Sequence, residues 1–112
     1  MTEKIYEVLV TPEFEKDFKK LDNVEQSRVR KAVQSLKYTP YSGKPLGFEF
    51  FREKKIEGKR IYFIVYDEFV VIFLIAVGGK KTQKETISKI RERFSDYKVE
   101  VEKAMKEIKR IF

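Results

Sequence analysis

The strongest constraint on the fold comes from residues 59–84, KRIYFIVYDEFVVIFLIAVGGKKTQK. Two apolar segments, residues 59–66 and 69–77, are separated by an acidic pair at 67–68, and the second segment ends in the glycine pair at 78–79. Segments of this length, rich in β-branched and aromatic residues and separated by a short polar turn, indicate a β-hairpin. Because residues 69–77 are apolar at nearly every position, we predict a central strand buried on both faces.

Two further strands are predicted from the same kind of pattern. Residues 5–10 are rich in β-branched and apolar side chains, as first strands of small sheets are. Residues 50–56 form the other strand, which returns through a turn at 57–58 into the hairpin. The segment 38–48 contains two prolines and two glycines and is predicted to be a loop. The expected sheet is therefore small, four-stranded and antiparallel.

A helical hairpin is predicted between the first strand and the loop. Thr11 is a suitable N-cap residue, and Pro12 follows at the first helical position, where its missing N–H costs nothing. Asn23 and Gln26 have the spacing of a capping box for a second helix. The apolar residues at helical spacing are Phe14, Phe18 and Leu21 in the first helix and Val29, Val33 and Leu36 in the second.

One long helix is predicted to end the chain, with Thr82 and Glu85 as its capping box. Its apolar stripe comprises Ile87, Ile90, Phe94, Tyr97, Val101, Met105, Ile108 and Phe112. Such a helix is longer than the sheet. It therefore either bends back at 95–96 or buries its extension, residues 98–112, in a partner; packing on its own domain is the plain alternative. The predicted order is β-α-α-β-β-β-α, an α+β fold.

Composition narrows the chemistry. The 112 residues suffice for one domain, residues 1–112, with no apolar run of the roughly 20 residues that a membrane span needs. The N-terminus lacks the pattern of a secretion signal, so a cytoplasmic protein is expected. Without histidine or cysteine the chain has no Ser-His or Cys-His pair and no thiolate metal site, and we expect neither metal nor cofactor. The net charge of +7 favours nucleic acid or an acidic protein as partner, although a well-solvated surface explains it too.

Cationic residues are expected to meet near the start of the second hairpin strand. Alternation places Arg60 and Tyr62 on one face of that strand, and the residues between them suit a core. On the preceding strand Arg52 and Lys54 share a face, and we expect the hairpin to bring them near Arg60 and Tyr62. Arginine binds phosphate bidentately, and tyrosine can stack on a base. The alternative is that Arg52 and Lys54 are solvated strand residues and that Tyr62 packs within the sheet.

Lysines follow the central strand directly. Lys80 and Lys81 leave it just before the final helix, whose N-terminus also favours anions, and Lys84 lies in the helix's first turn. A merely solubilising turn is the alternative. If these lysines meet Arg60 and Tyr62, the group forms a compact basic pocket whose first candidate ligand is RNA.

The order of elements and these motifs resemble the RelE/ParE superfamily of toxins from type II toxin–antitoxin systems, over roughly residues 5–97. Residues 58–81, GKRIYFIVYDEFVVIFLIAVGGKK, are similar to the family's arginine-bearing strand, acidic turn, apolar strand and basic exit. The KKTQK run at 80–84 is similar to the helix opening of the HigB-like branch.

The resemblance implies a toxin held inactive by a cognate antitoxin. Most RelE- and HigB-like members are ribosome-dependent endoribonucleases that cut translated mRNA with basic residues and no metal. By position, the implied catalytic residues are Arg60, Lys80, Lys81 and Lys54, and the implied RNA-binding residues are Arg52, Tyr62 and Lys84. The final helix is then a candidate contact for the antitoxin or for a second copy of the chain.

One departure from the family leaves other functions open. RelE has a tyrosine in its final helical segment, and the corresponding residues 85–87 here include none. A ParE-like inhibitor of DNA gyrase and a toxin-fold protein without catalysis, which binds an antitoxin or nucleic acid, are therefore the alternatives to a nuclease. Proton transfer has no obvious agent in this sequence: a lysine would need a pKa depressed by neighbouring cations, and Tyr62 is a weaker candidate.

Overall fold

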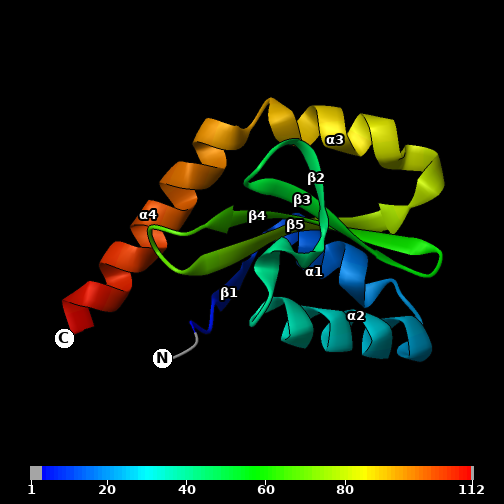
Figure 1. Cartoon of the computed structure of the whole chain (residues 1–112), viewed down its shortest axis with the longest axis horizontal. Helices are drawn as coiled ribbons and strands as arrows, with labels where there is room; N and C mark the ends of the chain where they lie inside the picture. Colours follow the sequence, from blue (N-terminus) through cyan, green and yellow to red (C-terminus); the bar gives the residue numbers. More distant parts are fainter. Residues whose placement is uncertain (1–3, 112) are drawn as a thin grey trace.

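The computed structural model describes residues 4–111 and the side chains of residues 4–107. The strands form one five-stranded sheet in the order β1-β5-β4-β3-β2, with helices on both faces (Figure 1). The strands are β1 (Glu7–Val10), β2 (Lys44–Phe48), β3 (Phe51–Ile56), β4 (Lys59–Tyr66) and β5 (Val71–Gly79). The helices are α1 (Pro12–Lys19), α2 (Asn23–Leu36), α3 (Gln83–Arg91) and α4 (Phe94–Ile111), with short 3₁₀ turns η1 (Pro40–Ser42) and η2 (Lys80–Thr82). The α+β class is confirmed, and no described helix is long and apolar enough to cross a membrane.

The predicted sheet is wrong in its strand count and in one pairing. β1 runs parallel to β5, with Glu7 opposite Val71, so the sheet is mixed. The expected loop contains the fifth strand, β2, which pairs antiparallel with β3. Pro45 and Gly47 suggested a loop, but β2 is an edge strand, where a residue without an N–H and a residue without a side chain are both tolerated.

The helical hairpin covers one face of the sheet. Its N-cap is confirmed: the Thr11 hydroxyl accepts from the Phe14 amide at 3.0 Å and donates to the Ile75 carbonyl at 2.7 Å. The second capping box was predicted one residue too late, because Asp22 and Glu25 form it. The core on this side contains Phe14, Val29, Leu36, Ile61, Phe63, Val65, Ile72 and Leu74.

The other face is covered by two helices where one was predicted. The helix breaks at residues 92–93, three positions before the expected bend, and neither glycine nor proline marks the break. Thr82 makes no side-chain capping bond, so that predicted box is absent. The apolar stripe packs on the sheet as predicted through Ile90, Tyr97 and Val101, with Met105 beside them. The Ile108 side chain and Phe112 lie outside the described residues.

A carboxylate in the β4–β5 turn joins three distant segments. Asp67 accepts hydrogen bonds at 2.6 Å from the hydroxyls of Tyr6, before β1, and Tyr41, in η1. The bonds from Tyr41 and then Tyr6 lower the pKa of Asp67. The bond to Asp67 in turn raises the pKa of Tyr6 to about 12, so Tyr6 remains a donor at neutral pH. The turn thereby fixes the N-terminal segment and the loop before β2.

Replacing this carboxylate is expected to weaken the fold in a pH-dependent way. Because Asp67 is exposed, Asp67→Asn should cost about 1 kcal/mol of unfolding free energy at pH 7. The folded state lowers the Asp67 pKa, so its contribution is complete above the ordinary value of 3.8 and is lost as pH falls through the lowered value. Urea unfolding of both proteins at several pH values measures the difference. Glu68→Gln removes the same charge from the same turn and should leave stability unchanged; an equal loss would contradict the role of Asp67.

Candidate functional site

A polar cluster lies at one end of the sheet, on the face covered by α3 and α4. Glu53 of β3 is opposite Tyr62 of β4, and both are buried. The Glu53 carboxylate lies 3.8 Å from Nε of Arg60, which is also on β4. Its second oxygen accepts a hydrogen bond at 3.0 Å from Nε2 of Gln83, the first residue of α3. These four side chains form what we call the Arg60 cluster.

Two buried polar atoms of the Arg60 cluster have no hydrogen-bond partner. They are Nε of Arg60, whose 3.8 Å approach to Glu53 is an ion pair but too long for a hydrogen bond, and the hydroxyl of Tyr62. Burial, and then the charge of Glu53, raise the pKa of Tyr62 against the opposing effect of Arg60, so the phenol keeps its proton. Buried donors without acceptors are rare in folded proteins. The cluster therefore retains two buried donors without acceptors, and Nε of Arg52 on the opposite face of β3 is a third such atom in the described residues.

Exposed lysines follow β5 at the end of the sheet where the Arg60 cluster lies. Gly78, opposite Arg60, leads directly into Lys80 and Lys81 of η2, and Lys84 follows in the first turn of α3. All three lysines are exposed, and within residues 4–107 none of them forms an ion pair. Together they give this end of the sheet a concentration of positive charge.

Arg52 and Lys54 lie on the opposite face of β3, so the expectation that they approach Arg60 and Tyr62 is wrong. Their partners across the ladder are Phe63 and Ile61, which face the α1–α2 side. Arg52 is buried, and its guanidinium donates to the backbone carbonyls of Glu49, Tyr41 and Gly43 at 3.0, 2.9 and 2.6 Å. In this structure Arg52 fixes the η1–β2 segment against β3.

Tyr62 has the predicted strand position but a different environment. Its ring is 1% exposed and packs in the core beneath α3 and α4. The ring therefore has no free face for a base, and its hydroxyl is a buried atom without a hydrogen-bond partner. This matches the sheet-packing alternative for the ring.

Glu53, Gln83 and Lys55 were not among the predicted site residues. Lys55 lies opposite Arg60 and is exposed, so it belongs with the surrounding lysines. The length of the predicted turn contained this information. A turn of two residues places Ile56 opposite Lys59, so Lys55 lies opposite Arg60 and Glu53 lies opposite Tyr62. Gln83 could not be found in this way, because its approach depends on where α3 starts.

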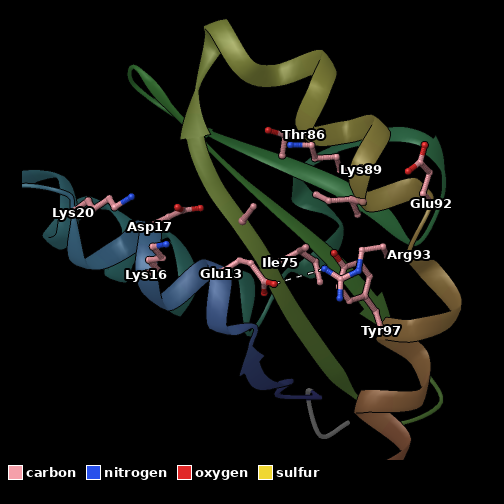
Figure 2. Close-up of a pocket in the computed structure, with 12 residues that line it drawn as sticks. Glu13, Lys16, Asp17, Lys20, Ile75, Thr86, Lys89, Glu92, Arg93 and Tyr97 are labelled. Atoms are coloured by element: carbon pink, nitrogen blue, oxygen red, sulfur yellow. Dashed lines mark ion pairs between the residues drawn. The ribbon is translucent and has the colours of Figure 1, made fainter.

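A separate cavity of about 460 Å³ lies between α1 and the α3–α4 pair (Figure 2). Glu13 and Arg93 cross it as an ion pair at 3.6 Å, with Ile75 of β5 at its floor. Cations and carboxylates both line it, and none of its side chains belongs to the Arg60 cluster. Nowhere in the described residues do three or more carboxylates gather as a metal site would require.

Comparison with known proteins identifies the fold. No family model and no curated protein sequence matches the chain. Among solved structures, the intact Escherichia coli RelBE toxin–antitoxin complex matches with 26% identity over 66% of this chain and 95% of that chain, with a TM-score of 0.62. A free E. coli RelE toxin carrying two arginine-to-alanine mutations matches with 24% identity over 80% and 98%, with a TM-score of 0.70. The RelBE2 complex of Mycobacterium tuberculosis matches with 23% identity over 70% and 95%, with a TM-score of 0.63.

Arg52 should be a stability residue. Arg52→Met keeps an unbranched side chain but leaves three carbonyls without their donor, so we expect a loss of about 2–4 kcal/mol in unfolding free energy. Lys54→Met, on the same face of the same strand, removes no bond within the described residues and should cost less than about 0.5 kcal/mol. Urea unfolding followed by circular dichroism measures both. Equal stabilities for the two variants would show that the carbonyl contacts contribute nothing.

Proposed function

We propose that this chain, which has the fold of the RelE superfamily, is the toxin of a type II toxin–antitoxin pair that cuts mRNA on the ribosome. The fold match supports the first part, because several of the similar structures are RelE toxins bound to RelB antitoxins. The two unpartnered buried donors in the Arg60 cluster, beside lysines without carboxylate partners, carry the second part. The assignment to the HigB-like branch, which rests on the KKTQK run at 80–84, stays a prediction.

The cluster suits stabilisation of charge on a phosphoryl group. In RNA cleavage the ribose 2′-OH attacks the adjacent phosphate, and negative charge grows on the phosphoryl oxygens. Arg60 would contact those oxygens through its guanidinium, with Lys80 and Lys81 adding charge from the exit of β5. Donors held in place before the reaction need no reorganisation when the charge develops, which is why they lower the barrier.

Glu53 acts in this proposal as a positioning residue. It is buried, lies 3.8 Å from Arg60, and is itself held by Gln83 at 3.0 Å. A carboxylate in this place fixes the direction of the guanidinium and keeps a buried cation from being uncompensated. Removing the Glu53 charge would free Arg60 to turn away from the substrate phosphate.

The same proposal defines the partners. A cognate antitoxin would hold the toxin inactive, and translated mRNA on the ribosome would be its substrate, which places its action in the cytoplasm. Residues 1–112 would act as one toxin domain, with residues 98–112 as a helical extension. Val101 within that extension is fully buried against the chain's own sheet, which supports a single unit.

Cleavage should depend on Arg60. In a reconstituted translation mixture, primer extension on an mRNA is expected to show cuts that require ribosomes and fall about 10²–10³-fold with Arg60→Ala. Lys80→Gln combined with Lys81→Gln should reduce cutting by a similar factor. Glu53→Gln should lower the rate less, and Arg60→Lys should not restore it, because lysine lacks the two-pronged geometry.

Lys31→Gln is the matched control. Lys31 is an exposed lysine of α2, on the far face of the sheet, and its loss should not affect cutting. Variants are compared at equal folded concentration. Intact mRNA with wild-type protein would overturn the nuclease proposal, and inhibition of gyrase supercoiling by the same preparation would then identify the ParE-like alternative.

A further inference from the structure

One side of α3 forms a shallow groove that begins at Lys84, one residue after Gln83 of the Arg60 cluster. Lys84, Ile87, Ser88 and Arg91 line it at helical spacing, and the groove has a volume of about 450 Å³. Gln83, just before Lys84, is the residue that bonds Glu53 of the cluster. Glu92 ends the groove after Arg91. The groove therefore runs along α3 from the proposed cleavage site towards the end of the helix.

Exposed aromatic rings lie at the far end of the groove. Phe48, at the end of edge strand β2, is 38% exposed, and Phe50 in the following turn is 37% exposed. Their ring centroids are 5.2 Å apart, and the Phe94 ring of α4 meets both edge-on, at 5.3 and 5.1 Å. The Arg91 guanidinium lies over the Phe48 ring, 5.4 Å from its centroid, so a stacked base would use the part of the ring that Arg91 leaves exposed. These rings, with Arg91 beside them, form an aromatic platform.

The charges on the two sides of α3 indicate what the groove binds. On the side facing the cavity of Figure 2, Lys89 pairs with Glu85 at 3.3 Å and Arg93 pairs with Glu13 at 3.6 Å. On the groove side, Lys84 and Arg91 are exposed and make no ion pair with any described residue. Unneutralised cations followed by exposed rings are the arrangement with which proteins hold single-stranded nucleic acid.

We propose that this groove carries single-stranded RNA away from the Arg60 cluster, with Lys84 and Arg91 on the phosphates and a base stacked on Phe48. The inference rests on the proposed function for the identity of the RNA, which would be the mRNA next to the cleaved bond. α3 spans about 14 Å between the cluster and the platform, so the track holds a few nucleotides. Glu92 marks its end because a carboxylate repels phosphate.

A tryptophan at the platform reports stacking directly, because the chain contains none. Phe48→Trp places a single indole in the platform, and its fluorescence is expected to be quenched on titration with a 12-nucleotide oligouridine. Val24→Trp is the matched control: Val24 is 59% exposed on α2, over the opposite face, and its indole should not respond. Oligouridine that leaves the fluorescence of the Phe48→Trp variant unchanged would overturn the proposal, as would equal quenching by polyglutamate, which would indicate an acidic protein partner.

Two further variants separate stacking from charge. Phe48→Leu keeps an apolar side chain but removes the ring, and it should weaken oligouridine binding about tenfold while unfolding remains cooperative. Lys84→Gln combined with Arg91→Gln should reduce the slope of log affinity against log salt by about 1.4, the value for two lost phosphate contacts on a single strand. Unchanged affinity in the first variant and unchanged slope in the second would each contradict the track.

Cleavage is measured on the same variants, so that the two proposals can fail separately. Ribosome-dependent cutting by the wild type and by Phe48→Leu at the same rate, with no oligouridine quenching of Phe48→Trp, would remove the track and leave the nuclease in place. Quenching of Phe48→Trp by oligouridine, with no mRNA cutting by wild type, would leave an RNA-binding groove and remove the nuclease.

Discussion

The structure depends on the pairing of two strands that are buried on both faces. Six consecutive residues of β4, 61–66, and five of β5, 71–75, are buried. Because alternate side chains of a strand point to opposite faces, this pair needs a helical layer on each side. α1 and α2 form one layer, and α3 and α4 form the other. The charged side chains of β4 are then confined to its first two positions, and Arg60 is the last of them before the buried run begins.

In the candidate site, buried side chains fix the geometry and exposed side chains supply the net charge. Arg60 and Glu53 are largely buried and neutralise one another, so their contribution is a fixed direction rather than net charge. Removing such a pair from water costs free energy, which Gln83 partly offsets by satisfying the second carboxylate oxygen. The attraction for an anion comes from the exposed lysines of η2 and α3, which lose little hydration. A long polyanion would be drawn in by the lysines and oriented by the buried pair.

Local sequence patterns predicted the features that depend on neighbouring residues. They failed for the features that depend on contacts between distant segments. The Thr11-Pro12 helix start and the β4 strand follow from propensity and alternation, and both are confirmed. β2 was not predicted because its proline and glycine indicate a loop. Both residues are tolerated in an edge strand, but only the completed sheet shows that β2 lies at the edge. Register could have been derived from the two-residue turn, and it would have replaced Arg52 and Lys54 by Glu53 and Lys55. The contact of Gln83 with Glu53 could not have been derived from the sequence, because it depends on how α3 packs over β3 and β4.

The break between α3 and α4 links the fold to the groove. Continued straight, α3 would leave the sheet after Arg91, because a helix advances about 1.5 Å per residue while the strands beneath it end. The break at 92–93 turns the chain so that Phe94 packs against Phe51 at 5.3 Å and the stripe continues to Val101. The same turn sets Phe94 against the exposed rings of Phe48 in β2 and Phe50 in the turn that follows. Packing of the C-terminal helix on its own sheet therefore also builds the aromatic platform, so one backbone feature serves both stability and the proposed RNA track.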